Sequence, residues 1–309
     1  MEGLVYKSTG SWYTVKDEMT GRYYDCRLKG KIRLKGIKST NPIAVGDRVV
    51  FELEEDRGVI TEIHPRDNYI IRKSVNLSKQ THIIASNIDL AFLVVTLNNP
   101  PTSTTFIDRF LVTTEAYDIK TILLFNKVDS YNDDELAEVK YLAMIYRKAG
   151  YECIGISAVT GKNIEKVKEV MKGNTCMVSG HSGAGKSTLI NAIAPELQLK
   201  TTSLSIQHQQ GQHTTTFAEM FDLSFGARII DTPGIKGFGM VDIEKEELTD
   251  YFPEFFALKG RCKFNNCLHT DEPQCAVKEA LENDNIAWSR YKSYLQILKG
   301  EDSVYREEE

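Results

Sequence analysis

The segment GHSGAGKS at residues 180–187 restricts the fold more than any other stretch, because it fits the pattern G-x-x-x-x-G-K-[ST]. The apolar run TCMVS before it predicts a strand, and STLINAIA after it predicts a helix that ends at Pro195. Glycines between a strand and a helix let successive backbone N–H groups surround a phosphate at the helix N-terminus. A glycine-rich turn without a ligand is the alternative, and the flanking strand and helix make it the weaker interpretation.

The side chains of this loop have separate expected roles. Lys186 is expected to neutralise the β- and γ-phosphate oxygens, which makes it a catalytic candidate as well as a nucleotide ligand. The hydroxyl of Ser187 is expected to bind Mg²⁺. The other loop residues that we expect to contact nucleotide are Gly180, His181, Ser182, Gly183, Ala184, Gly185 and Thr188.

The tetrapeptide NKVD at residues 126–129 indicates which base is bound. Asn126 can hydrogen-bond the carbonyl side of a purine, and the Asp129 carboxylate can accept from the ring N–H and the exocyclic amine of guanine together. Adenine cannot satisfy that arrangement, so the motif predicts guanine. Lys127 is expected to lay its methylene stem along the base, and Val128 completes the loop. Alone the tetrapeptide is a common turn sequence, but here it follows the apolar strand TILLF, where a base-reading loop belongs.

Two further segments complete a guanine-nucleotide domain. ISA, which ends at Ser157 and Ala158, fits a second loop against the base, and DTPG, from Asp231 to Gly234, fits the loop at Mg²⁺ and the γ-phosphate. The base loops precede the phosphate loop in the chain, so the sequence predicts a circular permutation in which the strands keep their places in the sheet. This order leads from DTPG directly into the C-terminal region, which predicts that loss of the γ-phosphate shifts that region.

Strands and helices alternate from about residue 86. The runs at 89–97, 121–126 and 152–157 are almost continuously apolar, as in parallel strands buried on both faces. FIDRFLVTTEAYD and DDELAEVKYLAMIYRKAG lie between them with apolar residues at helical spacing, and the second ends at Gly150. The pattern predicts a doubly wound α/β domain.

Residues 1–72 predict a small β-barrel of about five strands, most simply an OB-fold, because short β segments alternate with Gly, Asn and Asp turns. Residues 1–75 carry a formal charge of +3 and the remainder −8. RLKGKIRLKGIK at 27–38 has six basic residues and no acidic one, and basic and apolar residues alternate from Lys31 to Lys35. Such a row fits an RNA backbone, or it is a solvated strand face without a partner.

Four metal-ligand residues crowd into fourteen positions near the C-terminus: Cys262, Cys267, His269 and Cys275. The spacing C-x₄-C-x-H-x₅-C predicts a closed tetrahedral site for one structural Zn²⁺ per chain, with buried free cysteines as the alternative. Zinc is expected to tie this loop to the helix NDNIAWSRYKSYLQILKG. The residues along one face of that helix are predicted to be core rather than an RNA platform: Trp288, Tyr291, Leu295 and Leu298.

Hydrolysis requires a positioned water, which Ras-like enzymes orient with a Gln directly after DxxG. That place is Ile235 here, so another residue must act. GQHTTT offers His213 as a catalytic candidate, two residues before Thr215, which we align with the Mg²⁺-binding threonine of switch I. Thr214 and Thr216 compete with Thr215, and a solvent-exposed loop histidine is the alternative for His213.

Bulk properties are those of a globular chain: 309 residues, 41% hydrophobic and 26% charged, with a net charge of −5. No apolar run approaches the length of a membrane span, and the N-terminus MEGLVYKSTG lacks the features of a signal peptide. We therefore expect a cytoplasmic protein with no membrane partner.

The permuted series NKVD, GHSGAGKS, GQHTTT and DTPG, together with the barrel and the Cys and His cluster, resembles the RsgA (YjeQ, YloQ) family of circularly permuted bacterial GTPases over nearly the whole chain. The resemblance implies an α/β P-loop GTPase domain between an N-terminal OB-fold and a C-terminal zinc-binding, helical domain. We place these domains at 73–240, 1–72 and 241–309. It further implies hydrolysis of GTP to GDP and phosphate, stimulated by the small (30S) ribosomal subunit, and binding to that subunit and its 16S rRNA during late maturation.

We expect a monomer that binds GTP or GDP with Mg²⁺. Two other classes remain open: an RNA-binding module that holds GTP only as a structural ligand, and a GTPase that acts on tRNA or a membrane partner. The second of these has no evident use for a barrel paired with a zinc site.

Overall fold

The structure is a computed structural model that describes residues 1–30, 42–55, 57–73, 81–197, 218–231 and 243–300. The alternating basic residues of 31–35, His213, Thr215, Gly234 and Ile235 lie outside the described residues. The chain divides into two compact units, each drawn from distant parts of the sequence. Unit 1 contains Met1–Phe92, Ile164–Ser179 and Lys186–Gly239, and unit 2 contains Leu93–Asn163, Gly180–Gly185 and Met240–Glu309.

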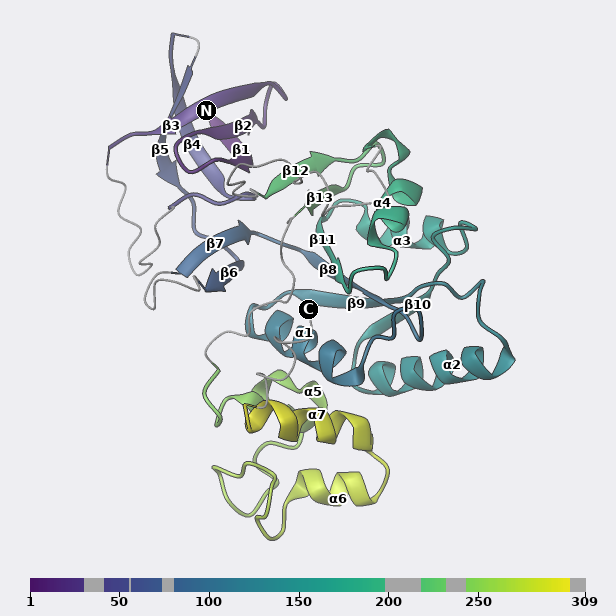
Figure 1. The fold of residues 1–309 in the computed structure, drawn as a ribbon. Helices are drawn as coiled ribbons and strands as arrows, with labels where there is room; N and C mark the ends of the chain where they lie inside the picture. Colours follow the sequence, from purple (N-terminus) through teal and green to yellow (C-terminus); the bar gives the residue numbers. More distant parts are fainter. Residues whose placement is uncertain (31–41, 56, 74–80, 198–217, 232–242, 301–309) are drawn as a thin grey trace, which may run out of the picture. The chain divides into compact units, whose positions relative to one another are not determined.

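The first five strands of unit 1 form a closed barrel (Figure 1). They are β1 (Glu2–Ser8), β2 (Tyr13–Asp17), β3 (Tyr23–Leu28), β4 (Arg48–Glu54) and β5 (Arg57–Ile63). The hydrogen-bonded order is β1-β2-β3-β5-β4, and β4 pairs again with β1, which closes the sheet on itself. Val5, Val15, Phe51 and Ile60 fill the interior and are fully buried. The predicted N-terminal barrel is confirmed.

A second group of strands in unit 1 includes β11, which ends where the phosphate loop begins. β11 (Thr175–Gly180) runs parallel to β13 (Arg228–Asp231), and β12 (Glu219–Asp222) is antiparallel to β13. β12 also pairs with β1 at Glu219 and Lys7, so the barrel is continuous with this sheet. The remaining elements are the hairpin β6 (Tyr69–Lys73) and β7 (Thr81–Ser86), the helices α3 (Ile164–Met171) and α4 (Lys186–Ile193), and a 3₁₀ turn, η1 (Pro195–Leu197).

Asp222 of β12 accepts hydrogen bonds from three side chains of the barrel. Tyr6 donates to its Oδ1 at 2.6 Å, Tyr23 donates to its Oδ2 at 3.2 Å, and the Lys16 ammonium also bonds Oδ2. Burial opposes ionisation of Asp222, but the hydrogen bonds from Lys16 and Tyr6 outweigh it and lower the pKa of the carboxyl.

Unit 2 contains the other parallel strands and their helices. β8 (Leu90–Val95) begins in unit 1 and ends in unit 2, and all six of its residues are buried, as its apolar run predicts. β9 (Lys120–Phe125) and β10 (Glu152–Gly155) pair in parallel, with Leu124 opposite Ile154. Helices α1 (Thr104–Ala116) and α2 (Asp133–Lys148) connect them in chain order.

Local signals explain the bounds of α2. Asn132 and Glu135 form a capping box at its start, in which the Asn132 side chain accepts from Glu135 N–H and the Glu135 carboxylate accepts from Asn132 N–H. The helix ends before Gly150, whose φ of 104° lies in the left-handed region. The alternation predicted from the sequence is therefore confirmed.

The C-terminal part of unit 2 is helical. It contains η2 (Leu248–Tyr251), α5 (Pro253–Phe256), α6 (Ala276–Glu282) and α7 (Trp288–Leu298), and α7 is drawn in yellow in Figure 1. Tyr291 and Leu298 are buried as predicted and Leu295 is half-buried, but Trp288 is 63% exposed, so its assignment to the core was wrong. Trp288 is the first residue of α7, and the residues that bury the rest of this helix face do not cover it. Tyr294 and Ile297 fill the core instead.

Arg290 of α7 is 1% exposed and joins three helices of unit 2. It donates to Asp108 of α1 at 2.6 Å and to both carboxylate oxygens of Glu254 in α5 at 2.7 and 3.0 Å. The guanidinium also lies 4.6 Å from the ring centroid of Phe252.

Among the described residues, no helix is both long enough and apolar enough to cross a membrane.

Candidate nucleotide and metal sites

The phosphate-binding loop has a backbone that only glycine can adopt at two points. Gly180 has φ of 143°, and a Cβ there would lie 2.6 Å from the carbonyl oxygen of Val94. Gly185 has φ of 96°, and a Cβ there would collide with Nδ2 of Asn126. These close approaches explain the glycine spacing and bring the loop against the end of β8 and against the NKVD segment within unit 2.

Asn126 links three of the predicted segments. It is 2% exposed, its Nδ2 donates to the carbonyl of Ala184 at 2.9 Å, and its Oδ1 accepts from the N–H of Ala158 at 3.1 Å. The first bond joins the base loop to the phosphate loop, and the second joins it to the ISA loop. Ser157 is fully buried, and its hydroxyl accepts from Thr160 N–H at 3.0 Å.

The other NKVD side chains differ in exposure. Lys127 has φ of 66°, and its ammonium donates to the carbonyl of Asn99 in the β8–α1 loop. Val128 is buried and Asp129 is exposed, so the carboxylate stands in solvent where a base can reach it. The arrangement presents an acceptor pair on a loop that buried contacts hold in place, as recognition of a guanine edge requires.

Lys186 and Asp231, two charged residues that the motifs predict to bind nucleotide and Mg²⁺, belong to unit 1. Lys186 is the first residue of α4, and burial lowers the pKa of its ammonium, so an anion close to it would stabilise the charged form. Ser187 and Thr188 follow in the same turn and are half-buried. Asp231 ends β13; burial raises the pKa of its carboxyl, and its cross-strand neighbour Glu219 raises it further. Such a carboxylate gains from a cation, as a Mg²⁺ ligand does.

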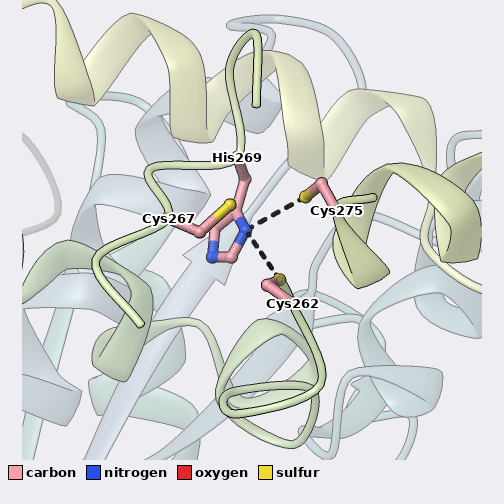
Figure 2. Close-up of side chains that lie close together, drawn as sticks. All are labelled: Cys262, Cys267, His269 and Cys275. Carbon is pink, nitrogen blue, oxygen red and sulfur yellow. Dashed lines mark hydrogen bonds between the residues drawn. The ribbon is translucent and has the colours of Figure 1, made fainter. Parts of the chain in front are cut away.

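The four residues of the Cys and His cluster converge on one point (Figure 2). Their ligand atoms all lie within 4.8 Å of one another, and Nδ1 of His269 is 3.3 Å from Sγ of Cys275 and 3.7 Å from Sγ of Cys262. In a tetrahedral zinc site with Zn–S bonds of about 2.3 Å, neighbouring sulfurs are about 3.8 Å apart. The cluster is therefore of the right size for that ion.

The chemistry of the cluster also fits a cation. Burial raises the pKa of Cys267 to about 12 and also raises that of Cys275, and negative charge on neighbouring thiolates adds to both. A bound metal ion reverses this cost, because it stabilises thiolates directly. The backbone N–H of Ala276 donates to Sγ of Cys262 at 3.3 Å, which further supports a thiolate there.

Helix α7 holds the ligand loop in place. The Tyr291 hydroxyl donates to the carbonyl of His269 at 2.6 Å, and the Tyr294 hydroxyl donates to that of Leu268 at 3.0 Å. Glu272 accepts from the N–H groups of Leu268 and Thr270 at 2.7 and 2.8 Å. The loop and α7 are thus joined by direct hydrogen bonds, and a role of zinc in tying them together stays a prediction.

Comparison with known proteins decides the family. The protein-family model described as RsgA GTPase matches residues 63–241, and the family model described as RsgA N-terminal domain matches residues 2–60. The chain belongs to the RsgA family. It is 72% identical to a protein of Christiangramia forsetii named small ribosomal subunit biogenesis GTPase RsgA, over 99% of this chain and 98% of that one. A Bacteroides fragilis protein of the same name is 54% identical over 99% of each chain.

Two solved structures resemble nearly the whole chain. The crystal structure of YjeQ from Thermotoga maritima has a TM-score of 0.79 and 39% identity, covering 97% of both chains. YloQ, described as a circularly permuted GTPase, has a TM-score of 0.75 and 32% identity, covering 97% of this chain and 94% of its own. The predicted permutation, fold class and family are therefore confirmed, and the chain is a GTPase.

The structure also contains site residues that the motifs do not indicate. Asn99 receives the Lys127 ammonium, and the ring of Phe106 stacks on His181 of the phosphate loop. Outside the sites, no motif indicates that Asp108, Glu254 and Arg290 form a buried group, since its members are separated by up to 182 residues. An Asp and an Arg at apolar positions of predicted helices are the signals that point to such a pair.

Proposed function

We propose that this chain hydrolyses GTP to GDP and phosphate and assists late maturation of the small (30S) ribosomal subunit, which it binds through 16S rRNA and which stimulates hydrolysis. The observation that carries the proposal is the 72% identity over 99% of the chain to a relative named for small ribosomal subunit biogenesis. The Asn126 bridge between the base loop and the phosphate loop supports guanine-nucleotide binding by the same chain.

The test is multiple-turnover phosphate release from GTP by the purified full-length protein, alone and with small or large ribosomal subunits side by side. We expect a slow basal rate that rises only with small subunits, and no comparable rate with ATP. Equal stimulation by large subunits would contradict the assignment of the partner. A preference for ATP would contradict the assignment of the nucleotide.

Within this reaction, Lys186 would bind the β- and γ-phosphates, Ser187 and Thr215 would hold Mg²⁺, and Asp231 and Gly234 would form the loop at the γ-phosphate. Mg²⁺ would neutralise charge that develops on the phosphate oxygens. His213, which lies outside the described residues, is our candidate for orienting the water. His213→Ala is expected to lower kcat while GTP affinity stays nearly unchanged, measured by phosphate release and by nucleotide titration. An unchanged kcat would remove His213 from the mechanism.

The C-terminal cluster would hold one structural Zn²⁺ per chain, and the ion would fix Cys262, Cys267, His269 and Cys275 around itself with no position open for substrate. We further propose domains at 1–72, 73–240 and 241–309, of which the first binds RNA through its basic segment. A monomer in the cytoplasm is the expected state. Size-exclusion chromatography with light scattering, and subunit co-sedimentation at increasing salt, test these points.

The alternative is an RNA-binding module in which GTP is only a structural ligand. Such a module would bind guanine nucleotide through the same loops but release no phosphate beyond one turnover. The turnover measurement above separates the two.

A further inference from the structure

The phosphate loop has an aromatic contact that the nucleotide motifs do not explain. The rings of Phe106 and His181 stack with centroids 3.8 Å apart and an interplanar angle of 29°. His181 is the second residue of the loop, directly after Gly180, whose backbone lies so close to the Val94 carbonyl oxygen that a Cβ would be 2.6 Å from it. Phe106 lies in the first turn of α1, and its N–H donates to the Ser103 hydroxyl that caps the helix.

The same turn of α1 is fixed from the other side by α7. The Thr105 hydroxyl donates to Oε1 of Gln296 at 2.7 Å, and Asp108 accepts from Arg290 at 2.6 Å. These two α1 residues flank Phe106 in sequence and, being three apart, share one face of the helix. Arg290 and Asp108 are almost completely buried, so the position of this turn relative to α7 is closely defined.

Helix α7 is in turn bound to the metal-ligand loop through the hydroxyls of Tyr291 and Tyr294. A continuous series of contacts within unit 2 therefore runs from the carbonyl of His269 through α7 and α1 to His181. We propose that Phe106 is a positioning residue for the phosphate loop, and that α7 sets the position of Phe106 through α1. This proposal rests on the proposed nucleotide site, and it makes the C-terminal helix a determinant of nucleotide retention.

The size of the effect follows from the contact. An aromatic pair stabilises the conformation that contains it, and the loss of one pair corresponds to a change of about twofold to tenfold in an equilibrium constant, here that of GDP binding. Phe106→Leu keeps an apolar side chain of similar burial but removes the ring, so it should speed GDP release by that factor. Phe106→Tyr keeps an aromatic ring at this position, so it should release GDP at a rate close to that of the wild type. Thr105→Val keeps the shape of the side chain and removes the bond to Gln296, so it should act in the same direction and more weakly.

The assay is displacement of a fluorescent GDP analogue from the full-length protein, with thermal unfolding of each variant recorded in parallel. Thr113→Val is the matched control, because it is the same change in the same helix and Thr113 bonds the carbonyl of Arg109 within that helix. The double variant Thr105→Val/Phe106→Leu should release GDP at a rate close to that of Phe106→Leu alone, since both changes act through one contact. His181→Leu tests the stack from the loop side and should resemble Phe106→Leu.

Reciprocity gives a second readout. If the packing of α7 favours the conformation of the phosphate loop that binds GDP, then GDP binding must stabilise α7 by the same coupling free energy. GDP should slow hydrogen exchange of α7 amides in the wild type, and Phe106→Leu should abolish that protection. The proposal is overturned if Phe106→Leu and His181→Leu fold normally and release GDP at the wild-type rate, or if the Thr105 and Phe106 effects multiply independently. Failure of the wild type to bind GDP would instead contradict the proposed function.

Discussion

Removal of the Arg290 guanidinium should destabilise the C-terminal part of unit 2 severely. In Arg290→Met, three hydrogen bonds to Asp108 and Glu254 are lost, and Asp108, which is fully buried, loses the cation that pairs with it. Breaking one partner out of a buried ion pair costs about 3–5 kcal/mol. At that magnitude, amide exchange in α7 should accelerate between about 150-fold and 5,000-fold, if exchange proceeds through unfolding of this region.

Native-state hydrogen exchange resolved to α1, α5 and α7 measures the effect directly and does not require two-state unfolding of the whole chain. Lys259→Met is the matched control, because it breaks the Lys259–Asp250 pair of the same region, whose side chains are 47% and 34% exposed. Exposed ion pairs contribute about 0–1 kcal/mol to the free energy of unfolding, so the amides of this variant should exchange at nearly the wild-type rate.

The pH dependence of Arg290→Met has a definite sign. Burial raises the pKa of the Asp108 carboxyl above its ordinary value, and Arg290 opposes that rise. Without Arg290 the pKa of folded Asp108 rises further, so the ionised carboxylate costs stability at neutral pH and protonation relieves that cost. The difference from the wild type should therefore be smaller at pH 5.5 than at pH 8. A loss no larger than that of Lys259→Met, or one independent of pH, would refute this account.

Three further predictions concern the sites and the barrel. Asp129→Asn should weaken GDP binding by about 30-fold to 150-fold in a fluorescence titration, while Asp133→Asn, exposed nearby in α2, should not. Cys267→Ser should reduce the zinc content below one ion per chain, as measured by elemental analysis, whereas Cys153→Ala, which lies outside the cluster, should leave the zinc content unchanged. Zinc should dissociate more readily as pH falls, because protons compete with the ion for the thiolates. Asp222→Asn should lower the free energy of unfolding by about 1 kcal/mol at pH 7. Because the pKa of Asp222 is lowered in the folded protein, the difference should begin to shrink below about pH 4, where the unfolded carboxyl takes up its proton, and should disappear only below the pKa of the folded carboxyl.

Much of the fold could be predicted because its signals are local. The buried run of β8, the capping box of Asn132 and Glu135, and the glycine after α2 each lie within a few residues of the element they define. The nucleotide motifs were readable for the same reason, since a phosphate loop requires glycines at fixed spacing. Trp288 was misassigned because helical periodicity identifies a face but not how far the neighbouring surface extends along it.

The contacts of Asn126 could not be derived from the tetrapeptide alone. Its amide reaches Ala184 and Ala158, which are 58 and 32 residues away, and a motif does not state which backbone groups will face it. The stack of Phe106 on His181 and the pairing of Asp108 with Arg290 depend in the same way on how α1 packs in unit 2.

The sequence by itself determined the kinds of chemistry present: a phosphate loop, a guanine-reading loop and four metal ligands, in a chain order that requires a permuted sheet. These follow from residue type and spacing, because each chemistry needs particular atoms at short range. Only the tertiary structure decided which distant residues support those groups, since burial and pairing between helices arise from the packing of the whole unit. The links from α7 through α1 to the phosphate loop belong to this second class.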